Sequence, residues 1–268
     1  MAELKEQVAV ASADLATLEA QVARVAQAAD SPTAEPMATV EVTPVPHEMA
    51  DAPTVEPTAM GEVTPIPQEM MEGAKVQEIG LIENYAATKF YPKIIVVLKD
   101  VPVRIYLTRL HREHVNKFSI EPFYRSSEVI LPGEVGVIEF VADQVGEFEI
   151  RNVGHNFGAA LIVVATKEEM KNYISAMGKQ MYALIHSIDD FRIFPDRLVV
   201  QEGVPVTVHN ISLIAEHKVS FGPFHQPENI NIKPKEITPI EFTPEDSGEY
   251  KIRHELHGFT GELIVEGN

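Results

Sequence analysis

Histidine is the residue type in this sequence with the clearest capacity for chemistry. The chain has ten histidines and no cysteine, and two of the histidines stand close together in the segment His254-Glu-Leu-His257. Imidazole nitrogen is a good ligand for Cu(II) and Zn(II). The lack of cysteine excludes thiolate metal sites, disulfides and cysteine nucleophiles. Any metal centre in this chain must therefore use imidazole and oxygen donors.

The overall composition narrows the range of partners. Of the 268 residues 45% are hydrophobic, and the formal net charge is −18. Nucleic acids and anionic membranes both favour clusters of Lys and Arg, so neither is expected as a partner. The sequence shows no run of about 20 apolar residues and no signal peptide, which predicts a soluble chain without membrane insertion.

Residues 1–29 are expected to form a coiled-coil helix. Apolar residues recur at alternating four- and three-residue steps from Leu4 to Val25, which is the a/d spacing of a coiled coil. We expect this helix to form a homo-oligomer or to pair with a coiled-coil partner. Docking of an amphipathic helix on the chain's own domains is the alternative.

Residues 30–74 are expected to form a disordered, acidic, Pro-rich linker. The segment 30–50 is repeated at 51–71, with 13 of 21 positions identical. Its prolines and its lack of Lys and Arg keep such a segment extended. The repeat is either a spacer lengthened by duplication or a peptide, displayed twice, that binds a protein partner.

From about residue 75 the sequence changes to short apolar and β-branched runs separated by turn residues. This pattern is typical of sandwich strands, which are predicted at 94–98, 103–107, 136–141, 147–153 and 160–164. A connecting helix is predicted at 167–180, with Thr166 as its cap and Gly178 near its end.

The β-rich region contains two copies of one pattern. Residues 90–103 align with 193–206, and residues 148–155 align with 250–257. Each copy, of about 90 residues, has the length of a Greek-key sandwich. The sequence therefore predicts a mainly β fold with two tandem domains, at 75–166 and 181–268.

At these positions the chain resembles the cupredoxin family, and in particular the copper domains of cytochrome oxidase subunit two and nitrous oxide reductase. The second copy carries the shared motifs, which are Phe194-Pro195 followed by Gly203-Val-Pro-Val206, then His217, then Phe242-Thr-Pro-Glu-Asp-Ser-Gly-Glu-Tyr250, and a closing Gly261-Glu-Leu-Ile-Val265. The resemblance covers roughly residues 76–166 and 181–267. It implies two cupredoxin-like sandwiches and favours a periplasmic or extracytoplasmic location, which the sequence itself leaves unknown.

The resemblance also implies a metal site in the second copy. His217 matches the family's first histidine ligand, and His257 matches its loop histidine. His254 takes the place of the family's cysteine at the short ligand spacing, whereas the wider spacing puts Arg253 there. Further donors are Glu262, near the usual methionine, and His225, which is otherwise a surface residue. Copper is the expected metal and zinc the second choice; the alternative is a set of solvated histidines without a metal.

The first copy is expected to be metal-free. His114 and His155 keep the two histidine positions as vestiges, but Asn152 replaces the cysteine. Asparagine is a poor ligand for these metals, so too few good donors remain. His111 is a further candidate donor but is expected to be an exposed turn residue. Three histidines have no matching position and are expected to be structural or surface residues, namely His47, His186 and His209.

Three functions fit these observations. The main hypothesis is a non-catalytic copper-binding subunit, tethered by the helix and linker into a larger respiratory or redox assembly. The second is a metal-free scaffold or adaptor without a cofactor, and the third is a type 2 copper enzyme. The sequence lacks the nucleophile elbow, the P-loop, the zinc-protease motif and the dinucleotide fingerprint, which favours the non-catalytic hypotheses.

Overall fold

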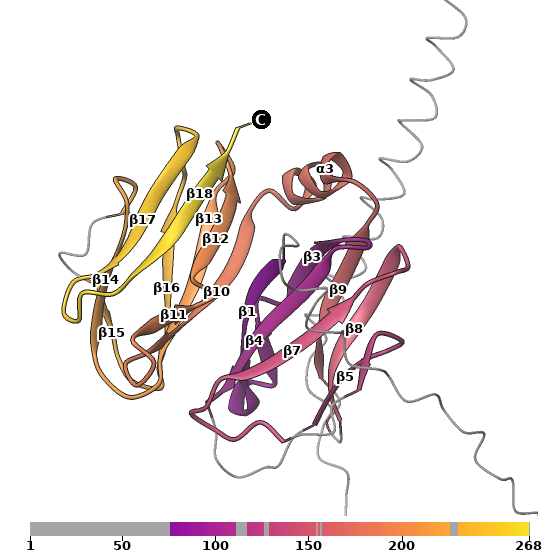
Figure 1. Cartoon of the computed structure of the whole chain (residues 1–268), viewed down its shortest axis with the longest axis horizontal. Helices are drawn as coiled ribbons and strands as arrows, with labels where there is room; N and C mark the ends of the chain where they lie inside the picture. Colours follow the sequence, from indigo (N-terminus) through magenta and orange to yellow (C-terminus); the bar gives the residue numbers. More distant parts are fainter. Residues whose placement is uncertain are drawn as a thin grey trace, which may run out of the picture. The chain divides into compact units, whose positions relative to one another are not determined.

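The computed structural model describes residues 76–110, 117–125, 129–153, 155, 157–225 and 230–267. The helix expected at 1–29, the linker expected at 30–74, His47, His111 and His114 lie outside these residues. Within the described residues, no helix has the length and apolar character needed to cross a membrane. Strands dominate, so the fold is mainly β, as the sequence predicts (Figure 1).

The strands fall into a first half, residues 76–164, and a second half, residues 180–267. Those of the first half are β1 (Gln77–Asn84), β2 (Lys89–Tyr91), β3 (Ile94–Leu98), β4 (Pro102–Arg109), β5 (Lys117–Ile120), β6 (Tyr124–Arg125), β7 (Gly136–Val141), β8 (Gly146–Val153) and β9 (Gly158–Val164), with a 3-10 turn, η1 (Tyr85–Ala87), after β1. Those of the second half are β10 (Gln180–Ser187), β11 (Arg192–Phe194), β12 (Arg197–Gln201), β13 (Val206–Ser212), β14 (His217–Phe221), β15 (Asn231–Ile232), β16 (Ile237–Phe242), β17 (Gly248–His254) and β18 (Thr260–Glu266). The five strands predicted from the sequence correspond to β3, β4, β7, β8 and β9, each within two residues.

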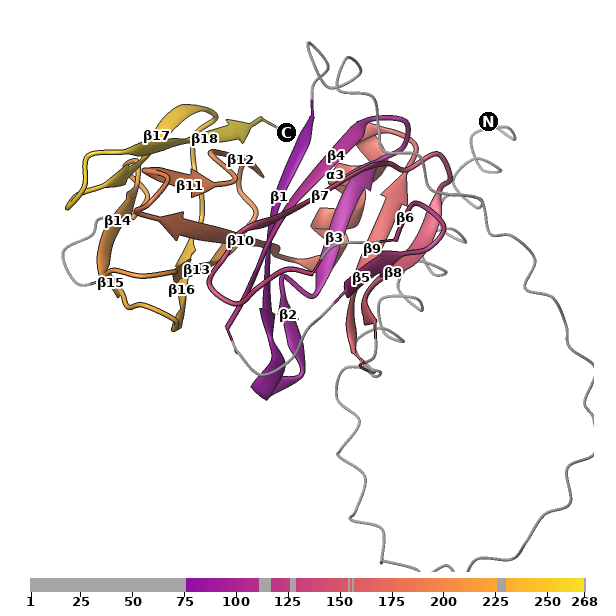
Figure 2. The same cartoon turned by 60° about the horizontal axis from the view of Figure 1, so that its bottom comes forward.

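Each half forms two sheets, and the strand order is the same in both halves. The orders are β2-β1-β4-β7 and β3-β9-β8-β5-β6 in the first half, and β11-β10-β13-β16 and β12-β18-β17-β14-β15 in the second. Strand β1 runs parallel to β4 and β3 parallel to β9, and the pairs β10–β13 and β12–β18 are parallel in the same way. Figure 2 shows β17, β18 and β12 as one layer and β10, β13 and β16 as the other.

Alternation along the strands places a core between the two sheets of each half. In β17, Ile252 is buried while Lys251 and Arg253 are exposed, because successive side chains of a strand point to opposite faces. Phe118 and Phe140 lie in the core of the first half, and Phe221 lies in the core of the second.

The helix α3 (Lys167–Met177) joins the two halves. The Thr166 hydroxyl accepts a hydrogen bond from the backbone N–H of Glu169 at 3.1 Å, and the Glu169 carboxylate accepts one from the backbone N–H of Ala165. Gly178 ends the helix in the left-handed conformation, φ 69°, which glycine adopts without steric cost. The helix is therefore three residues shorter than the predicted 167–180, and β10 begins at Gln180.

A third apolar cluster contains residues of both halves. Ile82 and Tyr106 pack there with Ile185. Strands β1 and β10 approach closely at Gly80, where an added Cβ atom would lie 2.1 Å from the carbonyl oxygen of Ala183. No other residue fits that spacing without a shift of backbone, so Gly80 is required by packing.

Candidate metal centre

Strands β14 and β17 place two histidines inside the second half. His217 is the first residue of β14 and is fully buried, on the same face of the strand as Val219. His254 is the last residue of β17 and is 2% exposed, on the same face as Ile252. The two-residue alternation that buries the apolar side chains therefore also turns both imidazoles inward.

The loop between β17 and β18 brings in the third histidine. The backbone N–H of Gly258 donates to the carbonyl of His254 at 3.0 Å, and the N–H of His254 donates to the carbonyl of Phe259 at 3.1 Å. Gly258 has φ 74°, which allows the tight turn. His257 lies exposed in this turn, while the Phe259 ring stacks on His254 with centroids 4.0 Å apart.

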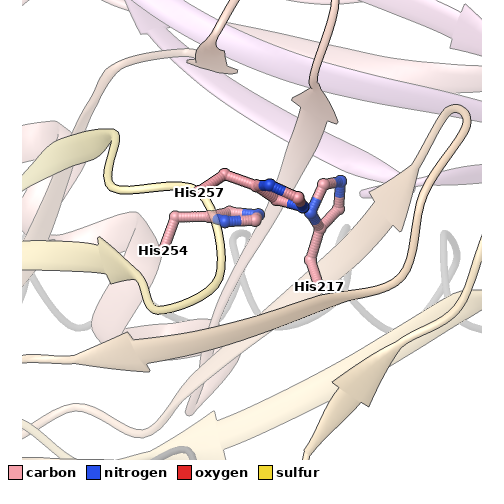
Figure 3. A group of neighbouring side chains, drawn as sticks. All are labelled: His217, His254 and His257. Carbon is pink, nitrogen blue, oxygen red and sulfur yellow. The ribbon is translucent and has the colours of Figure 1, made fainter.

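The three imidazoles converge (Figure 3). The ring centroids of His217 and His254 are 4.0 Å apart, and His257 lies 5.1 Å from the first and 5.2 Å from the second. One nitrogen of each ring lies within 4.8 Å of a nitrogen of the other two. The structure therefore brings together the three histidines that the family resemblance implied as ligands.

Burial keeps two of these imidazoles neutral. Together with a smaller effect of the neighbouring His257, burial lowers the pKa of His217 to about 4. Burial also lowers the pKa of His254 to about 3, with added effects of His217, His186 and His257. At neutral pH both rings are uncharged and keep a lone pair that a metal ion can accept.

These rings also lack the hydrogen bonds that buried polar groups normally make. Both nitrogens of His217 and both of His254 are buried without a hydrogen-bond partner in the described part of the chain. Each unpaired buried polar atom costs about 1–3 kcal/mol. A metal ion would relieve part of this cost, although metal–nitrogen bonds of about 2.0–2.1 Å require the rings to turn so that one nitrogen of each points at the ion. The three histidines therefore fit a metal site whose ligands are imidazole nitrogens.

Two further donors suggested by the sequence do not belong to this site. Glu262 lies on the outer face of β18, where its carboxylate pairs with Lys251 at 3.4 Å. His225 forms a bridge with Phe221, at the opposite end of β14 from His217. The family's cysteine could correspond to either Arg253 or His254. Arg253 is exposed and His254 is buried, so only His254 faces inward near the end of β17.

The first half has a different arrangement at the matching places. Asn152 in β8 corresponds to His254, since each lies two residues after a buried isoleucine. The Asn152 amide donates to Glu83, and Glu83 forms a buried ion pair with Arg109 at 2.7 Å. His155 packs on Tyr85 with ring centroids 4.8 Å apart. A charge-paired network therefore occupies this region in place of a set of imidazoles.

Sequence reasoning missed one residue of the region. His186 in β10 is fully buried, and its ring centroid lies 5.8 Å from that of His217 and 5.7 Å from that of His254. A signal was available, because His186 corresponds to Glu83 in the repeat. Both follow directly after a short apolar run that ends in Ile82 or Ile185, and each pairs with the matching residue of the parallel strand beside it.

The lowered pKa values predict that the metal-free protein loses stability in acid. The unfolded chain protonates its histidines near their ordinary pKa of 6.5, whereas folded His217 takes up a proton only near pH 4. The unfolded state therefore binds more protons in this range, and stability falls as the pH drops from 6.5 toward 4. Thermal midpoints measured across this range should fall more steeply for wild type than for His217→Leu. Parallel curves for the two proteins would show that His217 does not titrate abnormally.

Comparisons with known proteins add little to this description. No protein-family model and no curated protein matches the chain. Among solved structures, a copper nitrite reductase from Nitrosomonas europaea is 13% identical with a TM-score of 0.28, and the match covers 72% of this chain and 94% of that one. A copper-binding protein solved in its apo form is 25% identical with a TM-score of 0.30, covering 33% of this chain and 88% of that one. TM-scores this low support no conclusion, and the site rests on its own geometry.

Proposed function

We propose that the second half is a cupredoxin-like domain that binds one copper ion through His217, His254 and His257. The observation that carries this proposal is that both nitrogens of His217 and of His254 are buried without a hydrogen-bond partner among the described residues, with a nitrogen of the exposed His257 within 4.8 Å. Nitrogen donors suit both Cu(II) and Zn(II), and copper is preferred because Cu(II) stands above Zn(II) in the stability order of divalent ions.

We propose further that the chain acts as a non-catalytic copper-binding subunit of a larger assembly. Residues 1–29 would supply the association and residues 30–74 the tether, and the two halves would be the domains expected at 75–166 and 181–268. The first half would serve as a metal-free companion domain. Its buried Glu83–Arg109 pair supports that role, because it holds a charged network where the second half holds imidazoles.

The alternative is a metal-free scaffold, and one observation favours it. The network of Glu83, Arg109 and Asn152 supports it, because charged and amide groups pair with one another in the matching region of the first half. Against it stands the second half, where His254, at the place of Asn152, has no hydrogen-bond partner for either ring nitrogen among the described residues.

The copper-loaded protein should have a tetragonal, weakly coloured Cu(II) spectrum. The chain contains no cysteine, so no thiolate can give the intense charge-transfer band of blue-copper sites. Electron paramagnetic resonance and visible absorption of the full chain, loaded with Cu(II), test this directly. A signal that shows only hydrated Cu(II) would contradict the proposed site.

A further inference from the structure

The candidate centre has a fourth imidazole on its buried side. In β10 the alternating residues Tyr182 and Leu184 pack into the core of the second half, while Ala183 and Ile185 join the third cluster on the opposite face. His186 continues the series of Tyr182 and Leu184. Because side chains alternate between the faces of a strand, its imidazole points into the sandwich, toward the sheet that contains β14 and β17.

The ring contacts of His186 agree with this direction. Its neighbours are the rings of His217 and His254, at 5.8 and 5.7 Å between centroids. Two imidazoles that bind one ion through nitrogen atoms about 2.0–2.1 Å from it have ring centroids roughly 5–6 Å apart. The distances from His186 to His217 and to His254 are therefore those expected of histidines that bind the same metal ion.

A neighbouring amide determines which nitrogen of His186 carries the proton. The Asn210 Nδ2 group donates to the backbone carbonyls of Val208 at 2.9 Å and Thr238 at 3.4 Å. This orients the amide oxygen of Asn210 toward Nε2 of His186, at 3.0 Å. An amide oxygen can only accept, so Nε2 holds the proton and Nδ1 keeps the lone pair.

The remaining nitrogen has no partner. Nδ1 of His186 is buried and makes no hydrogen bond to any residue that the structure describes. A metal-binding histidine usually donates a hydrogen bond from one ring nitrogen to a neighbouring protein group, which turns the other nitrogen toward the ion. The pair formed by Asn210 and His186 has this arrangement.

The first half shows that a side chain at the place of His186 can contact the end of the strand in the opposite sheet. Glu83 occupies the place of His186, and Asn152 occupies the place of His254. The Glu83 carboxylate accepts a hydrogen bond directly from the Asn152 amide. The two places are therefore within contact distance in this architecture, and in the second half both are histidines.

We propose that His186 is a fourth imidazole ligand of the metal centre and binds through Nδ1. This inference rests on the copper site proposed above and deepens it. The group with nitrogens within 4.8 Å consists of the other three histidines, so an ion binding His186 would lie toward the buried side of that group. Four protein nitrogens leave less room for water or substrate on the ion, which suits a centre that holds copper rather than one that activates substrate.

The test counts nitrogen ligands and measures affinity on the full chain. Pulsed electron paramagnetic resonance of the Cu(II)-loaded protein should show four imidazole nitrogens in wild type and three in His186→Gln. Glutamine can still hydrogen-bond to Asn210, so the variant removes the ligand with little change in the core. We expect its Cu(II) affinity to fall by at least about tenfold, given that even second-shell changes cost about 10–100-fold.

His209→Gln is the matched control. His209 is the half-buried histidine of β13, and its Nδ1 lies 3.3 Å from the carbonyl of Tyr182. Its replacement should leave both the nitrogen count and the affinity unchanged. If His186→Gln does not fold, the count in wild type alone decides between four ligands and three.

The outcomes separate this inference from the function it rests on. Three nitrogens in wild type, or an unchanged affinity in His186→Gln, would overturn the role of His186 and leave the three-histidine copper site intact. If wild type binds no copper at all, the proposed function and this inference both fail.

Discussion

Replacing His254 with alanine should abolish most of the copper binding of this protein. His254 is 2% exposed, and its ring lies close to both His217 and His257, so its loss removes a donor that no neighbour can replace. Changes in the second shell of metal sites cost about 10–100-fold in affinity, and loss of a direct ligand should cost at least about 100-fold. Isothermal titration of the metal-free full chain with Cu(II) measures the effect.

Asn152→Ala is the control for that experiment. Asn152 holds the corresponding place in the first half, where it donates to Glu83 instead of facing other imidazoles. Its replacement should leave the copper affinity of the second half unchanged, whatever it does to the stability of the first. Identical copper binding by wild type and His254→Ala would eliminate the proposed site.

Replacing Arg109 with methionine should destabilise the protein by about 3–5 kcal/mol, because it leaves a charged partner in the core. Arg109 and Glu83 have side chains that are 1% and 0% exposed, and their charged atoms are 2.7 Å apart. The Arg109 guanidinium also donates to the carbonyl of Ile130 at 3.3 Å. Equilibrium unfolding in urea gives the free energy of unfolding of each protein.

Arg151→Met serves as the matched control. Arg151 pairs with Glu149 on the surface, with side chains 60% and 45% exposed, and such pairs contribute about 0–1 kcal/mol. The double change Glu83→Leu and Arg109→Met should cost less than Arg109→Met alone, since no unpaired charge remains. Equal losses for Arg109→Met and Arg151→Met would show that the buried pair contributes nothing special to the fold.

The strands and two of the three converging histidines follow from local patterns in the sequence. Period-two alternation locates β7 and β8, and the pair His254 and His257 is visible as a short segment. The same alternation decides between His254 and Arg253, since the residue two beyond buried Ile252 must also face inward. The family resemblance added His217, from a distant strand, and implied that all three histidines are ligands.

The two further donors suggested by the sequence lie outside the site for equally local reasons. Glu262 stands between Gly261 and Leu263, which is buried in the core, so the alternation of β18 turns its carboxylate outward. His225 lies where the chain turns back at Phe221, away from the three histidines. The face of the strand, and not nearness along the chain, decides which side chains enter the site.

His186 could not be assigned from its own strand. In an apolar run such as β10, a single buried histidine is usually a core residue with satisfied hydrogen bonds. Its importance comes from the opposite sheet, which brings His217 and His254 within 6 Å of its ring. Such a contact depends on how two sheets pack, and the pattern within one strand does not specify it.

The two halves illustrate two solutions to one physical problem, which is how to keep polar groups inside a sandwich. The first half pairs the buried carboxylate of Glu83 with Arg109 and Asn152. The second half gathers imidazoles, and both ring nitrogens of His217 and of His254 lack partners among the described residues. A bound metal ion would give the buried polar groups of the second half a partner, as the ion pair does in the first half.

The metal content of the protein purified from its native source, without chelators, tests this account most directly. Mass spectrometry of the digested protein should find copper close to one equivalent per chain, with zinc well below it. Protein that is folded and carries neither metal would contradict the copper site and leave the metal-free scaffold as the better description.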